Sequence, residues 1–182
     1  MVLSAAALAA GALGGIAQTK QKEHVQIPTV AARPEDVSSI EAIVHASYET
    51  ISGGVGVPRQ WGRDQTLFDP HVRFVAIAVD PVSKETKTDS FSEQELADDT
   101  NAESVRDGFV EHELGHSIQR FGNVATVLSS YEIKISATGK AAARGVNIFQ
   151  LYFDGKRWWI LSVVWDEERP GNPIPAELLP KN

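Results

Sequence analysis

The sequence of 182 residues contains no cysteine. Disulfide bonds, thiolate nucleophiles and cysteine metal ligands are therefore excluded, and the absence is compatible with any redox compartment. Positive charge is also scarce, because 17 Lys and Arg residues stand against 24 Asp and Glu residues and leave a net charge of −7. Without a basic run, this balance argues against a general nucleic-acid binder and against a binder of anionic membranes.

Long apolar runs are also missing, apart from residues 1–17, which carry no charge and are mostly Ala, Leu and Gly. This segment is too short and too rich in small residues for a membrane span, and it predicts a secretory signal peptide. Small residues at Gly15 and Ala17 favour cleavage before Gln18, which predicts a secreted or periplasmic protein with no membrane contact after signal removal. Because no Lys or Arg follows Met1, a disordered tail on a cytoplasmic protein is the alternative.

The rest of the composition is that of one globular domain. Hydrophobic residues make up 42% and charged residues 23%, and the length suits one core better than two. Residues 18–34 are polar, contain two prolines and are assigned to a linker. We place the domain at residues 35–175 and a C-terminal tail at residues 176–182, because prolines crowd the end of the chain.

Hydrophobic periodicity predicts the order helix, short helix, strand, helix and then several strands. Pro34 suits the first turn of a helix, and Ser92 with Glu95 fits a capping box at the start of another. We expect helices over 34–52, 61–68 and 93–104, a charged loop over 80–87, and strands over 72–79, 124–136, 143–153 and 157–166. This order predicts an α+β fold.

The last of these strands is apolar on both faces between residues 158 and 165. An antiparallel strand with one face in water would alternate apolar and polar residues more cleanly. We therefore expect one face to pack on the helices and the other on a second copy of the chain. This predicts a homodimer formed through the outer face of the sheet.

His112, Glu113 and His116 match the HExxH pattern of zinc proteases without error. On a helix, residues four apart lie about 6 Å apart, so both imidazoles reach one zinc ion and the Glu activates its water. On a strand, four residues span about 13 Å, which is too far for two ligands of one ion. The meaning of the motif therefore depends on whether residues 109–121 form a helix or a strand.

The neighbouring residues favour a strand for residues 109–121. Gly122 and Asn123 join the segment to a strongly β sequence, as in a hairpin, and Gly108 breaks the chain before it. The longer metzincin pattern also fails, because Gln119 and Gly122 stand where it requires Gly and His. We therefore expect no metal and no other cofactor, and a zinc hydrolase is kept as a third alternative.

Short motifs are spread over most of the domain. They are the Trp61 to Pro70 segment, the Gly108-Phe109-Val110-Glu111 strand entry, the Arg120 to Ala125 turn, Ser129 to Glu132, Arg144 to Asn147, Asp154 to Ile160, and Trp165-Asp166. In these motifs the chain from Glu35 to Pro175 resembles the nuclear transport factor 2-like (NTF2-like) superfamily, which includes SnoaL-like and ketosteroid-isomerase-like domains. The resemblance implies a cone-shaped, cystatin-like fold, with a strongly bent mixed-to-antiparallel sheet packed on about three helices.

The resemblance also implies a ligand pocket at the mouth of the cone. Some members of the superfamily are isomerases, dehydratases, cyclases or epoxide hydrolases, while many others only bind or assemble, so the fold does not choose among these functions. Their catalytic motifs do not transfer to matched positions, and the catalytic residues are unknown. We expect an exported domain that binds a small apolar molecule, with a cofactor-free lyase or isomerase of the SnoaL type as an extension. A non-catalytic assembly domain is the alternative.

Six residues are candidates for the pocket, namely His112, His116, Asn147, Tyr131, Trp61 and Asp64. On a strand the two histidines share a face with Val110, and they could act as acid and base or as hydrogen-bonded wall or interface residues. Asn147 lies on an apolar face, where its amide could orient a ligand or satisfy a neighbour. Tyr131 shares a face with Val127 and Ile133, and the alternative to a place in the pocket is a place in the core. Trp61 and Asp64 fit the cone mouth, with the protein surface as the alternative for the Asp.

Overall fold

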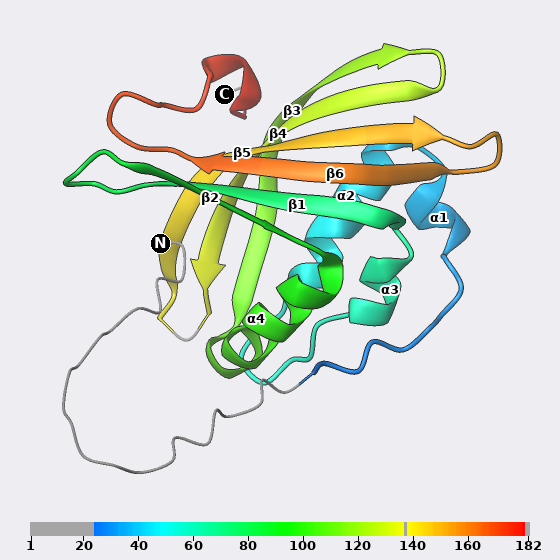
Figure 1. Ribbon diagram of the computed structural model, residues 1–182, viewed down its shortest axis with the longest axis horizontal. Coiled ribbons are helices and arrows are strands. Elements are labelled where there is room, and N and C mark those ends of the chain that lie inside the picture. Colours follow the sequence, from blue (N-terminus) through cyan, green and yellow to red (C-terminus); the bar gives the residue numbers. More distant parts are fainter. Residues whose placement is uncertain (1–23, 137, 181–182) are drawn as a thin grey trace.

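The computed structural model describes residues 24–136 and 138–180 (Figure 1). The predicted signal peptide, residues 1–17, lies outside these ranges. The end of the predicted linker, residues 24–33, is an irregular segment without helix or strand. Within the described ranges, no helix combines the length and the apolar character that a membrane crossing needs.

Short polar signals set the beginnings of the helices. The described helices are α1 (Pro34–Val37), α2 (Ile40–Ile51), α3 (Trp61–Gln65) and α4 (Glu93–Asp107). The Ser39 hydroxyl accepts a hydrogen bond from the Ala42 amide and begins α2, so the single helix predicted over 34–52 is two helices. The predicted capping box of Ser92 and Glu95 is present at the start of α4.

The described strands form one six-stranded sheet in the order β2-β1-β6-β5-β4-β3. They are β1 (Phe68–Val79), β2 (Thr86–Phe91), β3 (Phe109–Phe121), β4 (Val124–Ile135), β5 (Lys140–Phe153) and β6 (Trp158–Glu167). β1 runs parallel to β6, and the other neighbours are antiparallel. The meander from β3 to β6 is confirmed. The loop predicted over 80–87 is partly wrong, because Thr86 and Lys87 belong to the edge strand β2.

The core lies between the inner face of the bent sheet and the helices, which Figure 1 shows gathered on one side of it. Ile43 and Val44 of α2, Val127 of β4 and Ile160 of β6 are all at most 2% exposed. The predicted fold class, an α+β fold with a mixed sheet packed on a few helices, is confirmed.

The C-terminal end of the chain packs on the opposite, outer face of the sheet. The short turn η1 (Ala176–Leu178) buries Leu178 to 2% exposure, and the Ser130 hydroxyl donates a hydrogen bond to the Leu178 carbonyl. A side chain at Gly115 would place its Cβ 2.6 Å from that carbonyl oxygen, so the close approach requires glycine. Residues 176–180, assigned by sequence to a tail, therefore cover part of the outer face.

Candidate functional site

Strand β3 carries the HExxH residues, and a β-bulge decides where they point. The pairing with β4 shifts between Glu113 and Gly115, which inserts one extra residue into β3. His112 lies on the outer face with Val110, whereas His116 lies on the inner face. The prediction that both histidines share one face is therefore wrong, because the bulge reverses the alternation between them.

The two imidazoles cannot bind one metal ion in this arrangement. His112 Nε2 lies 3.7 Å from Glu132 Oε1 on the outer face, and His116 Nδ1 lies 3.1 Å from Glu113 Oε1 on the inner face. Among residues 24–136 and 138–180, no three His, Cys, Asp or Glu side chains are grouped to hold a metal. The strand therefore lacks the one-sided geometry on which HExxH zinc chemistry depends.

Polar side chains gather instead on the inner face of the sheet. We call this group the inner polar cluster, and its members are Tyr48, Glu111, Glu113, His116, Ser129 and Asn147. Tyr48 reaches the cluster from α2, and the other side chains come from the neighbouring strands β3, β4 and β5. Ser129 and Asn147 lie directly opposite each other in the pairing of β4 with β5.

A chain of hydrogen bonds runs through the cluster. The Asn147 amide nitrogen donates to Glu111 Oε1 at 2.9 Å and to the Tyr48 hydroxyl oxygen at 3.2 Å. The Tyr48 and Ser129 hydroxyl oxygens are 2.7 Å apart, and Ser129 donates to Glu113 Oε1 at 2.6 Å. The chain thus leads from the buried Glu111 carboxyl to Glu113, beside the partly exposed imidazole.

Burial sets the protonation of the cluster. Loss of hydration raises the pKa of the Glu111 carboxyl to about 7, although the hydrogen bond from Asn147 lowers it. Burial also raises the pKa of the Tyr48 and Tyr131 hydroxyls, and the nearby charge of Glu111 adds to both shifts. Glu111 can therefore hold or release a proton near neutral pH, while both phenols stay protonated.

An aromatic wall adjoins the inner polar cluster. Trp165 lies directly opposite Asn147 in the pairing of β5 with β6, and its ring centre is 5.7 Å from that of Phe91. Phe91 stacks in turn on Phe74 at 6.1 Å, and both Phe91 and Trp165 are only partly buried. The Tyr131 hydroxyl makes no hydrogen bond within the described part of the chain. The inner face therefore presents polar groups beside a flat apolar surface.

A second pair of acids lies where α2, α3 and α4 meet. Asp64 is 1% exposed and accepts a hydrogen bond from the Thr50 hydroxyl. Its second oxygen and Glu93 Oε1 have no hydrogen-bond partner among the described residues. Burial raises the pKa of Asp64 to about 7, and burial together with the charge of Asp64 raises the pKa of Glu93 to about 8.

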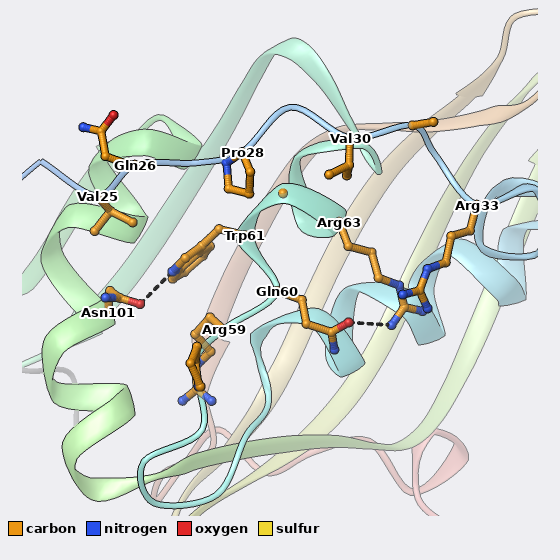
Figure 2. Close-up of a pocket in the computed structure, with 13 residues that line it drawn as sticks. Val25, Gln26, Pro28, Val30, Arg33, Arg59, Gln60, Trp61, Arg63 and Asn101 are labelled. Carbon is orange, nitrogen blue, oxygen red and sulfur yellow. Dashed lines mark hydrogen bonds between the residues drawn. The ribbon is translucent and has the colours of Figure 1, made fainter.

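Trp61 lies apart from both groups of polar residues. It lines a groove between the irregular N-terminal segment and α3, which Figure 2 shows with its lining residues. The volume of this groove is about 480 Å³. The Trp61 indole N–H donates to Asn101 Oδ1 at 2.8 Å, which fixes the ring against α4. In the same groove the Arg63 guanidinium is occupied by Asp36, with both nitrogen–oxygen distances at 2.8 Å. Trp61 therefore belongs to an outer groove and not to the inner face.

The six candidates consequently fall in different places. Asn147, His116 and Tyr131 come together on the inner face, whereas His112, Trp61 and Asp64 do not join them. Sequence analysis missed Tyr48 and Glu111. A signal for Tyr48 was its place four residues after Val44 on the apolar stripe of the first long helix. Glu111 was missed because the candidates on β3 were His112 and His116, and before the bulge Glu111 lies on the opposite face from His112.

Among known proteins, the chain matches solved structures by fold. No family model and no curated protein matches the sequence. The solved structure of Rv3472, a protein of unknown function from Mycobacterium tuberculosis, is 16% identical over 76% of this chain and 80% of its own, with a TM-score of 0.52. An NTF2-like protein of unknown function from Methylobacillus flagellatus is 14% identical over 72% of this chain and 95% of its own, with a TM-score of 0.45. The CaMKII hub of S. rosetta is 16% identical over 59% and 82%, with a TM-score of 0.40.

At these identities the likeness concerns the arrangement of helices and strands and not the chemistry. The match to Rv3472, with a TM-score of 0.52, shows that most of the chain shares the fold of that structure, and other matching structures are described as NTF2-like or as having a cystatin-like fold. The chain therefore has the cystatin-like, NTF2-like α+β fold, which confirms the resemblance found in its sequence.

Proposed function

We propose that the inner polar cluster and the aromatic wall bind a small molecule with a flat apolar body and one hydrogen-bonding group. The observation that carries this proposal is the buried Glu111 carboxyl, which lies near a Tyr131 hydroxyl without a partner in the described chain. Burial of an ionisable carboxyl costs free energy and raises its pKa, so the place of Glu111 beside the Tyr131 hydroxyl supports a ligand that hydrogen-bonds to both groups. The wall of Phe91 and Trp165 suits the apolar body of the ligand.

Acid–base chemistry on the bound molecule extends this proposal. As a carboxylate, Glu111 can take a proton from a carbon next to a carbonyl group and return it to another carbon, which is an isomerisation without a cofactor. The Tyr131 hydroxyl can donate to the carbonyl oxygen on which negative charge develops. The raised pKa of Glu111 suits both halves of such a transfer near neutral pH.

The proposal is tested by measuring the binding of 2-naphthol through the quenching of tryptophan fluorescence. We expect 2-naphthol to bind about tenfold more tightly than naphthalene, because only the former offers a hydroxyl to the cluster. Tyr131→Phe should remove most of that difference, and His112→Ala, on the outer face, should leave it unchanged. Equal affinities for 2-naphthol and naphthalene would contradict the proposed site. An equal loss of affinity for 2-naphthol in Tyr131→Phe and His112→Ala would also contradict it.

Self-assembly is the second candidate function, and the outer face of the sheet favours it. Val75, Val164, Ile148 and Leu128 lie directly opposite one another on β1, β6, β5 and β4 and form an apolar row. All four side chains are only partly buried. A continuous apolar row across four strands is typical of a surface that another protein covers, and a second copy is the simplest such partner.

Ile148→Lys places a charge in the middle of this row and is expected to convert a dimer into a monomer. Size-exclusion chromatography with light scattering measures the change directly. Gln65→Lys adds the same charge on the exposed side of α3 and should leave the dimer intact. A monomeric wild-type protein at micromolar concentration would rule out this second function.

A further inference from the structure

The outer face of the sheet also carries a hollow at the tip of the β3–β4 hairpin. Its volume is about 380 Å³, and its lining comes from β3, β4 and β5. In Figure 1 this hairpin tip lies away from η1, so the C-terminal turn does not cover it. Most of its lining residues belong to two cross-strand rows of different chemistry.

The first row is aromatic and aliphatic. Phe121 is 87% exposed and lies directly opposite Val124, which is 53% exposed. Beyond the hollow, the row continues in register to Tyr152 on β5 and to Trp159 on β6, whose ring is covered by the Arg157 guanidinium. A phenylalanine exposed to this degree gains nothing from the fold, and its neighbours extend it into a patch that marks a contact site.

The second row is polar and uncharged. Gln119, Thr126 and Gln150 lie directly opposite one another, two residues along the strands from the first row. The Thr126 hydroxyl donates to the Gln150 amide oxygen at 3.2 Å, which leaves the Gln150 amide N–H groups for another partner. Side-chain amides and hydroxyls both donate and accept hydrogen bonds.

Free charge is absent from the described residues that line the hollow. None of them is acidic, and Arg120 is the one basic residue. Its guanidinium carbon lies 5.1 Å from the ring centre of the buried Trp158, and its Nε donates to the Gly122 carbonyl at 2.8 Å. The cation is thus occupied by the protein, and the hollow offers a ligand an aromatic face and neutral hydrogen-bonding groups.

We propose that this hollow binds a neutral carbohydrate. A sugar ring has one face of C–H groups, which packs on an aromatic ring, and a rim of hydroxyls that both donate and accept hydrogen bonds. Phe121 supplies the ring, and Gln119 and Gln150 supply the amides. Because neighbouring strands lie about 4.8 Å apart, the row from Phe121 through Val124 to Tyr152 extends about 10 Å and can contact an adjoining sugar unit.

A second copy of the chain fits this hollow less well. The apolar row that suits self-association, from Val75 to Leu128, lies on the other side of the Gln119 row from Phe121. An interface between two copies that was centred on the hollow would bury the uncharged polar side chains of Gln119, Thr126 and Gln150. Burying amides without matched partners is costly, whereas sugar hydroxyls satisfy them.

Affinity electrophoresis in native gels that contain hydroxyethyl cellulose, soluble xylan or glycogen tests the proposal. We expect retardation by at least one polymer, with Phe121→Ala weakening the affinity at least tenfold and Gln150→Ala several-fold. Val82→Ala is the matched control, because Val82 is 88% exposed on the loop that joins β1 to β2. Unchanged thermal melting of each variant establishes that the fold is intact.

Three results would overturn the carbohydrate site. The first is that none of the three polymers retards the protein, and the second is that Phe121→Ala is retarded as strongly as the wild type. The third is that Val82→Ala loses as much affinity for the polymer as Phe121→Ala. Sedimentation velocity on the same samples identifies the alternative partner. Self-association that depends on Phe121 without any retardation assigns the hollow to a second copy of the chain.

Discussion

Raising the pH from about 5.5 to about 8.5 is expected to lower the free energy of unfolding by several kcal/mol, because each pH unit over which one group is protonated only in the folded chain removes about 1.4 kcal/mol. The cause is the burial of three carboxyls, Asp64, Glu93 and Glu111, whose pKa values are raised to about 7, 8 and 7 in the folded chain. In the unfolded chain these groups lose their protons near pH 4. Between that pH and about 8 the folded state binds more protons, so stability falls as the pH rises.

Other carboxyls act in the opposite direction at lower pH. Hydrogen bonds from Arg63 lower the pKa of Asp36, and a hydrogen bond from Tyr152 lowers that of Asp69. Each of these groups contributes stability above the pKa of the unfolded chain and loses it as the pH falls through the folded value. Maximum stability is therefore expected near pH 5, between the two effects.

Urea unfolding followed by tryptophan fluorescence at several pH values measures this dependence. Glu93→Gln should flatten the decline above pH 6, because the neutral amide cannot ionise where the carboxyl is buried. Glu103→Gln is the control on the same helix, since the Glu103 side chain is 41% exposed. A stability that stays constant or rises between pH 5.5 and 8.5 would show that the three carboxyls are hydrated in the folded protein.

Replacing Asn147 with Leu is expected to destabilise the protein by about 3 kcal/mol at neutral pH. The amide is 7% exposed and donates to both Glu111 and Tyr48, so its loss leaves buried acceptors without a donor. The same hydrogen bond lowers the pKa of Glu111, so the variant should raise that pKa further. The destabilisation should therefore grow as the pH rises, since ionising Glu111 becomes harder.

Gln150→Leu supplies the comparison for this variant. Gln150 lies on the same strand but is exposed on the outer face, and its replacement should change stability by less than about 0.5 kcal/mol. Urea unfolding at pH 6 and pH 8 measures both variants. Equal stability of Asn147→Leu and wild type would mean that the amide does not satisfy the buried groups of the inner polar cluster.

Local signals predicted most of the fold. Ser92 and Glu95 predicted the start of α4, and Gly122-Asn123 predicted the β3–β4 turn. A helix cap and a hairpin turn each depend on a few consecutive residues, so the local sequence is enough to predict them. Strand β2, Thr86–Phe91, was not predicted, since its charged residues resemble a loop. It is a strand because β1 pairs with it, and this is a tertiary contact that local sequence does not express.

The candidate site was less predictable for a geometric reason. Asn147 was identified because it interrupts an apolar face, and the structure places it at the centre of the inner polar cluster. Glu111 was not identified, because the alternation of residues along β3 assigns each side chain to a face only when the strand is regular. The bulge between Glu113 and Gly115 breaks that regularity, and nothing in the strand's alternating pattern marks where the extra residue sits.

The titration of the Glu111 carboxyl, followed by carbon-13 NMR of protein labelled at its glutamate carboxyl carbons, tests the central claim most directly. The resonance is assigned by its absence in Glu111→Gln. The buried inner polar cluster predicts a midpoint at about pH 7, and 2-naphthol should shift that midpoint by pairing with the carboxyl. A midpoint near the ordinary value of 4.5, unaffected by 2-naphthol, would mean that Glu111 is solvated and that the inner face holds no acid–base site.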